Sequence, residues 1–267
     1  MSEKNIKNEY TDPFLSVEDL SHALFDANQK MAGIIKERDE IFANISHDLR
    51  SPITAIHNAV EYLESDLDIS PEEQKKAIHL IHERTDALQT MINNIFLLTR
   101  LDNSGDKMLK KEDIPCGPFL EDFFYLCEAD SKYSKRNLIL DVPEDFNYLI
   151  SIDPHQMNRV LDNLFNNALK HTSSDASITL SASIADQKVI ITVSDDGEGI
   201  SHENLAHIFD RSYKVDTSRT PTSNSGAGLG LSICQKIISI HDGTISCESD
   251  PEHRKGTRFI IELPVIC

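Results

Sequence analysis

The stretch ISHDLRSP, residues 45–52, places a histidine, an acid, an arginine and a proline inside a long helical pattern. On both sides of it, apolar residues recur in alternating steps of three and four, which is typical of a heptad seam in a helical bundle. The seam consists of Leu20, Leu24, Ala27, Met31, Ile34, Ile41 and Ile45, and then Leu49, Ile53, Ile56, Val60, Leu63 and Leu67. His47 lies two residues, about 200°, from both Ile45 and Leu49, so its side chain should point away from the seam into solvent.

Pro52 follows this histidine closely and weakens the helix beside it. A proline has no N–H to donate to the carbonyl of Asp48, and its ring crowds that carbonyl. We therefore predict a bend point next to His47.

A second helix is expected after the break DLDISPEEQ. Ser70 suits the N-cap, Pro71 the first helical position, and the two glutamates that follow suit the first turn. Helical spacing then continues to about residue 102, with apolar residues at Ile78, Ile81, Leu88, Met91, Ile95, Leu98 and Leu101. Two long helices joined by a short loop form a hairpin with little core of its own, so we expect a homodimer built around a four-helix bundle.

The sequence changes character beyond residues 102–118, which carry the turn residues and charges of a domain boundary. Helical periodicity at 119–133, 154–172 and 231–241 is mixed with strand-like runs at 137–142, 148–153, 176–184, 188–194, 244–249 and 257–263. Several strands are short and joined by tight turns. This pattern favours a mixed sheet covered on one face by helices, and not a doubly wound parallel sheet.

The composition of the 267 residues excludes several classes of protein. Lys and Arg number 26 against 44 Asp and Glu, a net charge of −18, which argues against a broad nucleic-acid-binding surface. The five cysteines are scattered and odd in number, which indicates reduced thiols; His79 and His82 lack nearby cysteines and are interpreted as a solvated face, not a zinc site. The sequence shows no signal peptide and no apolar run that could span a bilayer, so we expect this chain itself to be soluble.

The helix at 153–172 (DPHQMNRVLDNLFNNALKHT) has two sides of different chemistry. Met157, Val160, Leu161, Leu164, Phe165 and Ala168 form one apolar stripe. Asn163, Asn167 and Lys170 gather on another face, where two carboxamides and an ammonium could hold a hydrated metal ion and touch phosphate oxygens. The alternative is a polar surface strip.

Two glycine-containing stretches follow. In VSDDGEGI (193–200), Asp195 ends a strand-like run, and Gly197 and Gly199 would let the backbone pass close to a flat ligand; a simple turn is the alternative. In GAGLGLSI (226–233), Gly226, Gly228 and Gly230 open an apolar helix whose N–H groups could face an anion. The second stretch lacks the Gly-Lys-Ser/Thr of a Walker A loop, and alone it is a weak signal.

The order of these motifs resembles the sensor histidine kinases of two-component systems, from about residue 35 to 264. SHDLRSP resembles the H box, DNLFNNALKH the N box, DDGEGI the G1 box, IFDRSY the F box and GAGLGL the G2 box, and HRKGTRF follows at 253–259. Upstream, VEDLSHALFDANQKMAGI is similar to the second half of a HAMP signal-relay module; a plain coiled-coil linker is the alternative. The implied domains are a leader (1–16), a HAMP-like or coiled-coil helix (17–40), a dimerisation and phosphotransfer domain (41–104), a linker (105–118) and an ATP-binding domain (119–267).

The resemblance implies a role for each motif residue. His47 would be the phospho-acceptor, with Asp48 orienting its ring and accepting its proton. In an α/β sandwich of the type shared with Hsp90, MutL and gyrase, Asn167 would bind Mg²⁺, Asn163 would support that site, and Lys170 would meet phosphate.

The glycine-rich motifs would shape the rest of the ATP site. Asp195 would accept a hydrogen bond from the adenine amino group, in a pocket shaped by Gly197 and Gly199. Gly226, Gly228 and Gly230 would hinge a lid at 211–226 and offer N–H groups to the phosphates. After an in-line transfer to His47, the phosphoryl group would pass to an aspartate of a response regulator.

Two departures from the family pattern and two rival interpretations remain open. Ser212 stands where the F box usually has a second Phe, and Ser51 stands where strong phosphatases have Thr or Asn, so phosphatase activity is possible.

An ATPase or serine kinase with the same nucleotide fold would have no reason to carry the hairpin with His47. A non-catalytic dimeric scaffold would have no reason to keep the nucleotide motifs. The HAMP-like start leads us to expect membrane tethering of the full-length protein.

Overall fold

The structure is a computed structural model, and it describes residues 17–65, 69–104, 109–211, 213, 228–251 and 254–266. The chain divides into two compact units, Met1–His47 and Asp48–Cys267. Among the described residues, none of the helices combines the length and apolar character needed to cross a membrane.

The first unit is described from Val17, where helix α1 (Val17–Glu64) begins. Its apolar side chains are largely exposed, including Leu20 (61%), Leu24 (65%) and Met31 (61%). A heptad seam exposed in this way needs a partner helix to cover it. The helix continues through Pro52 into the second unit.

Helix α2 (Pro71–Ser104) begins where the sequence predicted. The N–H and Oγ of Ser70 donate to Glu73 Oε2 at 2.9 and 2.6 Å, and Glu73 N–H donates back to Ser70 Oγ at 3.3 Å. This reciprocal capping box satisfies donors that the first turn of a helix leaves unpaired. The assignment of Ser70 as N-cap is confirmed.

A small sheet precedes the main one. Strand β1 (Glu112–Pro115) pairs antiparallel with β3 (Leu149–Ile152), and helix α3 (Cys116–Ala129) follows β1 directly. A short 3-10 turn, η2 (Ser131–Tyr133), leads on toward the main sheet. Strand β1 and the start of α3 fall inside the segment that we assigned to a linker, because a four-residue strand without alternating hydrophobicity gives little signal in the sequence.

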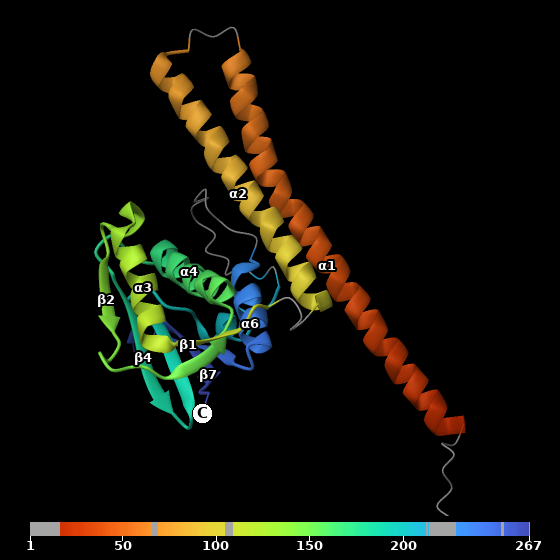
Figure 1. Cartoon of the computed structure of the whole chain (residues 1–267). Helices are drawn as coiled ribbons and strands as arrows, with labels where there is room; N and C mark the ends of the chain where they lie inside the picture. The colour runs from red at the N-terminus through yellow and green to blue at the C-terminus, as the bar shows by residue number, and fades with distance from the viewer. Residues whose placement is uncertain are drawn as a thin grey trace, which may run out of the picture. The chain divides into compact units, whose positions relative to one another are not determined.

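The main sheet has the strand order β2-β4-β5-β7-β6 (Figure 1). Its strands are β2 (Asn137–Asp141), β4 (Ser177–Ala185), β5 (Lys188–Asp195), β6 (Thr244–Asp250) and β7 (Arg254–Pro264). Only the β2–β4 pair is parallel, and the other neighbours are antiparallel. The predicted mixed sheet is confirmed.

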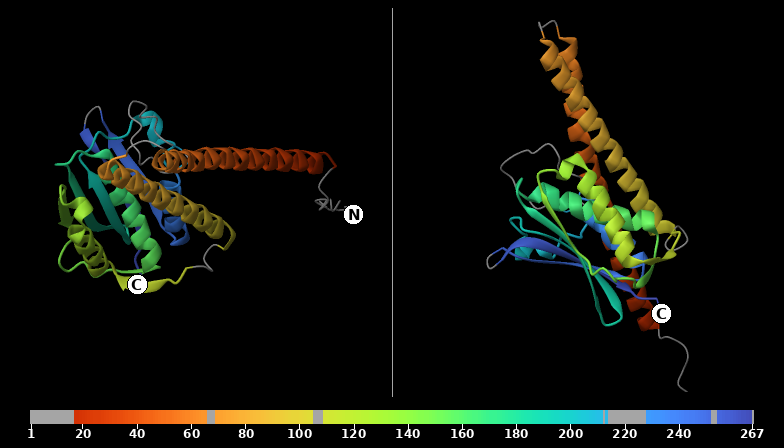
Figure 2. Two further views of the ribbon diagram at one scale, coloured as in Figure 1. Left: turned by 90° about the horizontal axis from the view of Figure 1, so that it is seen from above. Right: turned by 60° about the vertical axis from the view of Figure 1, so that its left-hand side comes forward.

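Helices cover one face of this sheet. Alongside α3, helices α4 (Pro154–His171) and α6 (Gly230–Ile240) lie on the same side of the strands in each view (Figures 1 and 2). A one-turn helix, α5 (His202–Leu205), lies near β6. Residues along β4 alternate accordingly: Ile178 and Leu180 are fully buried beneath the helices, whereas Ser177 and Thr179 between them are half-buried on the other face.

Candidate functional site

The residues of the histidine stretch share one short segment of α1. His47 and Ser51 are exposed, as the helical phase predicted for His47, and Asp48 is half-buried. A neutral imidazole presented to solvent is a competent nucleophile near neutral pH, and a carboxylate one residue away can orient it.

Helix α4 carries the predicted phosphate and metal residues. The six residues of its predicted apolar stripe are all buried, and Asn163 and Asn167 are half-buried at its margin. The amide nitrogen Nδ2 of Asn163 is fully buried, and the Asn163 side chain hydrogen-bonds the buried Cys234 thiol. The amide of Asn163 is therefore held in the core, while its Oδ1 lies beside the start of α6.

The start of α4 is fixed by buried polar contacts that the sequence did not suggest. Asp153 caps the helix by accepting from Gln156 N–H at 3.1 Å, and its own N–H donates to His241 Nε2 at 2.9 Å. Nδ1 of His241 contacts the Ile237 carbonyl at 2.7 Å. Because Nε2 accepts and Nδ1 must therefore donate, the buried His241 ring is neutral. Burial lowers the pKa of His241.

Asp195 ends β5 and has a well-defined hydrogen-bonded environment. Its Oδ1 accepts from Gly197 N–H at 2.9 Å and from Thr257 N–H at 3.3 Å. Burial raises the pKa of Asp195, and these two N–H donors oppose that rise. Since both bonds go to Oδ1, Oδ2 is the oxygen that we expect to meet a ligand donor.

Two glycines allow close backbone approach around Asp195. A Cβ on Gly197 would lie 2.6 Å from the His171 carbonyl oxygen, so only glycine lets this turn pack against the end of α4. Gly256 has φ +101°, and a Cβ there would lie 2.0 Å from the Asp195 carbonyl oxygen. The motif KGT was noted in the sequence, but nothing in it assigned Gly256 or Thr257 to the Asp195 site.

The remaining predicted glycines are placed as follows. Gly199 and Gly228 have positive φ values of 81° and 64°. Gly230 opens α6, and a Cβ there would stand 3.5 Å from Asn163 Oδ1, so the start of α6 lies beside the Asn163 side chain. Its N-cap residue Leu229 provides no side-chain hydrogen bond. Gly226, Ser212 and most of the predicted lid lie outside the described residues.

The end of α4 is basic and partly desolvated. Burial lowers the pKa of Lys170. For His171, burial and the neighbouring Lys170 charge lower the pKa, while Asp195 and Glu198 act in the opposite direction. Lys170 is exposed enough to reach a bound anion.

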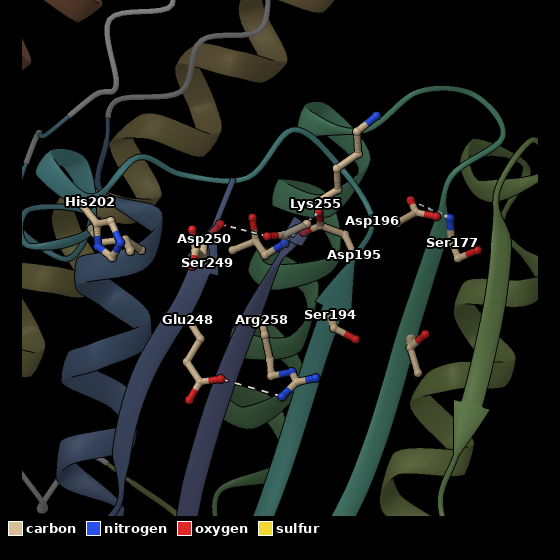
Figure 3. A pocket seen from close by; sticks show the side chains of 14 residues that line it. Ser177, Ser194, Asp195, Asp196, His202, Glu248, Ser249, Asp250, Lys255 and Arg258 are labelled. Carbon is tan, nitrogen blue, oxygen red and sulfur yellow. Dashed lines mark hydrogen bonds and ion pairs between the residues drawn. The ribbon is translucent and has the colours of Figure 1, made fainter. Parts of the chain in front are cut away.

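A polar cavity of about 610 Å³ lies on the open face of the sheet (Figure 3). Thr179, Ser194 and Arg258 line it, and Arg258 pairs with Glu248 at 3.7 Å. Asn163 and Asn167 do not border this cavity. Asp195, one of the predicted nucleotide residues, also lines this cavity, so the cavity shares the Asp195 turn and lies away from Asn163 and Asn167.

Two family models match the chain in sequence. Residues 37–104 match the His Kinase A phospho-acceptor domain, and residues 152–266 match the histidine kinase-, DNA gyrase B- and HSP90-like ATPases. The chain is 33% identical over 231 residues to the sensor protein SrrB of Staphylococcus aureus, a match that covers 85% of this chain and 38% of SrrB. The chain thus spans less than half the length of the curated relatives it matches.

Solved structures show the same fold. The histidine kinase ThkA, in complex with the response regulator TrrA, matches with a TM-score of 0.69 and 25% identity, covering 91% of this chain and 66% of that one. The Acinetobacter baumannii histidine kinase AdeS matches with a TM-score of 0.62 and 20% identity, covering 83% of this chain and 98% of that one. With a phospho-acceptor hairpin followed by an ATPase-type sheet domain, this chain belongs to the sensor histidine kinases.

Proposed function

We propose that this chain is an ATP-dependent protein-histidine kinase that phosphorylates itself on His47 and passes the phosphoryl group to an aspartate of a response regulator. The observation that carries the ATP site is the half-buried Asp195, whose Oδ1 is held by Gly197 and Thr257 N–H, in the same domain as the uncapped start of α6. A helix N-terminus favours an anion, and the ATPase family match supports a nucleotide as the ligand.

The groups around this position fit ATP. Asp195 Oδ2 would accept from the exocyclic amino group of adenine, with Gly197 and Gly199 shaping the adenine pocket. The N–H groups that follow Gly228 and Gly230, together with Lys170, would bind phosphate oxygens. Gly226 is assigned by its motif alone.

Asn167, supported by Asn163, would hold a Mg²⁺ ion. Carboxamide oxygens are ligands that Mg²⁺ accepts, and both residues lie on the same margin of α4. When bound, the ion would supply charge neutralisation at the phosphates.

The reaction at His47 is a substitution at phosphorus. A ring nitrogen of His47 forms a bond to the γ-phosphorus while the bond from that phosphorus to the bridging oxygen of ADP breaks. Asp48 orients the ring and accepts the ring proton, so that the phosphorylated imidazole is not left with a positive charge. The aspartate of a response regulator then attacks the phosphohistidine.

The hairpin also supplies surfaces for partners. Ile53 (53% exposed), Ile78 (49%) and Phe96 (63%) present apolar surface on α1 and α2, which supports a homodimer in which each hairpin covers the other. The ThkA complex with a response regulator supports the same class of partner here. Exposed Ser51 keeps a hydroxyl that could position a water for phosphatase activity toward the regulator.

We also propose that the full-length protein is associated with a membrane, because residues 17–40 resemble a HAMP module. The test is fractionation of cells that express the native gene. Recovery of the protein in the membrane fraction, released by detergent and not by salt, would support the proposal; recovery with the soluble proteins would contradict it.

Labelling with γ-³²P ATP and Mg²⁺ tests the kinase function. The parent chain should acquire an acid-labile, base-stable label, and His47→Gln should remove it. His57→Gln is the matched control, since His57 is an exposed histidine on the same helix, 3.4 Å from Glu61. Label that persists in His47→Gln, or that also disappears in His57→Gln, would contradict the assignment of His47.

A further inference from the structure

Arg136 lies in the turn before β2 and contacts the end of α4, although the two segments are more than thirty residues apart in sequence. Its Nη2 donates to the carbonyl oxygens of Leu169 at 3.2 Å and Thr172 at 3.1 Å, and its Nε donates to Thr172 Oγ1 at 3.3 Å. The Arg136 backbone is itself held, because its N–H donates to the Tyr133 carbonyl at 2.8 Å. Both the guanidinium and the backbone of Arg136 are therefore held by hydrogen bonds.

These contacts complete a helix end that has no glycine cap. The C-cap residue Thr172 is extended, with φ −124° and ψ 156°, and its Oγ1 donates to the Ala168 carbonyl at 2.6 Å. The last carbonyls of a helix lack intrahelical partners, and the negative end of the helix dipole favours a cation. Arg136 supplies both the donors and the charge.

The turn that Arg136 closes is the one that carries Asn167 and Lys170. The same turn sets the Asp195 side of the site, because Gly197 packs where a Cβ would meet His171 O at 2.6 Å and Thr172 Cγ2 at 3.0 Å. Gly197 N–H in turn donates to Asp195 Oδ1. A continuous series of contacts thus joins Arg136 to both halves of the candidate nucleotide site.

We propose that Arg136 is a positioning residue for ATP binding, which fixes the distance between the phosphate-facing end of α4 and the adenine-facing Asp195. It touches neither the nucleotide nor His47. The inference rests on the proposed function, since it presupposes that the site between α4 and Asp195 binds ATP.

The test compares Arg136→Gln and Arg136→Lys with the control Lys188→Gln. Lys188→Gln also removes a cation and its ion pair with Glu262, at 2.7 Å, but Lys188 lies at the opposite end of β5 from Asp195. We expect Arg136→Gln to raise the KM for ATP about tenfold through the loss of charge-assisted hydrogen bonds, with a smaller change in kcat. Arg136→Lys should raise the KM for ATP less than Arg136→Gln does, and Lys188→Gln should leave this KM unchanged.

A purely structural role would give a different result. In that case, Arg136→Gln would lower the melting temperature but leave KM unchanged when assayed well below it, which would overturn the proposal. If Arg136→Gln does not fold, Arg136→Lys decides: a raised KM supports the proposal and a parental KM overturns it. The Gly197 amide resonance provides a second readout, because it should shift in the Arg136 variants and not in Lys188→Gln.

The outcome for the parent chain separates this inference from the function on which it rests. A parent chain that binds no ATP would contradict the proposed function itself. A parent chain that binds ATP, with Arg136→Gln binding it equally well, would overturn only the role of Arg136.

Discussion

The two candidate sites of this chain are built in opposite ways. His47, Asp48 and Ser51 lie within about one turn of a single helix, and His47 is exposed. The candidate nucleotide residues come from α4, from the end of β5, from the start of α6 and from β7, and except for the exposed Lys170 they are half-buried or buried. A nucleophile that two partners must reach needs exposure, whereas a pocket that must fit a ligand needs support from many sides.

This difference predicts how each site responds to mutation. A substitution in the hairpin site should remove chemistry and leave the fold intact, because an exposed side chain contributes little to packing. A substitution among the supporting residues of the sheet domain should change stability and binding together, because those residues hold one another in place.

The largest effect should come from Asn167→Asp. It tests whether a substitution in the sheet domain can remove phosphorylation without changing the fold. We expect labelling to fall roughly 100-fold, because the carboxylate adds a negative charge beside the metal and the phosphate oxygens of the proposed site. Labelling rates give the effect, and sedimentation should show an unchanged dimer. Labelling at the parental rate would contradict the assignment of Asn167.

Two glycine substitutions compare the sheet domain with helix α1 by their effects on the free energy of unfolding. Gly256→Ala forces a side chain into a backbone with φ +101° and against the Asp195 carbonyl, so we expect a loss of about 3 kcal/mol or more. The matched change in α1, Gly33→Ala, meets nothing within 4 Å and should stabilise its helix by about 1 kcal/mol. Denaturant and thermal melts measure both. Equal effects of the two changes would contradict the comparison.

The smallest effect concerns His241, the buried histidine that holds the start of α4. The folded-state pKa of His241 lies below the ordinary value of 6.5, so the unfolded chain binds a proton more readily. Stability from His241 is therefore fully present above pH 6.5 and is lost as the pH falls below it, by at most about 1.4 kcal/mol per pH unit.

Chemical melts between pH 7.5 and 5 test this sign. The slope of stability against pH should be shallower in His241→Gln than in the parent chain. A slope that is unchanged in His241→Gln would show that the buried ring does not titrate as the structure requires. His171, whose pKa is also lowered, contributes with the same sign in the parent chain and in His241→Gln.

The sequence was sufficient for features that depend on local pattern. The heptad phase placed His47 outward, Ser70 marked the start of α2, and alternation and periodicity located the mixed sheet and its helices. It was not sufficient for Arg136, Gly256 and His241, because each acts through a contact with a segment far away in the chain. Their residue types gave no local signal of those contacts.

The same physical reason explains why the segment that we assigned to a linker contains strand β1. Strand β1 is stabilised by pairing with β3, more than thirty residues later, and not by its own sequence. Local pattern therefore predicted the exposed position of His47 and the buried stripe of α4, whereas it gave no signal of the residues that position the candidate nucleotide site.

Identification of the phosphorylated atom tests the central claim most directly. After incubation with ATP and Mg²⁺, peptide mapping under base-stable conditions should place one phosphate on the peptide that contains His47, and ³¹P NMR should show a phosphoramidate signal. Phosphate on a serine, threonine or a different histidine, or no phosphate on a chain that hydrolyses ATP, would contradict the account.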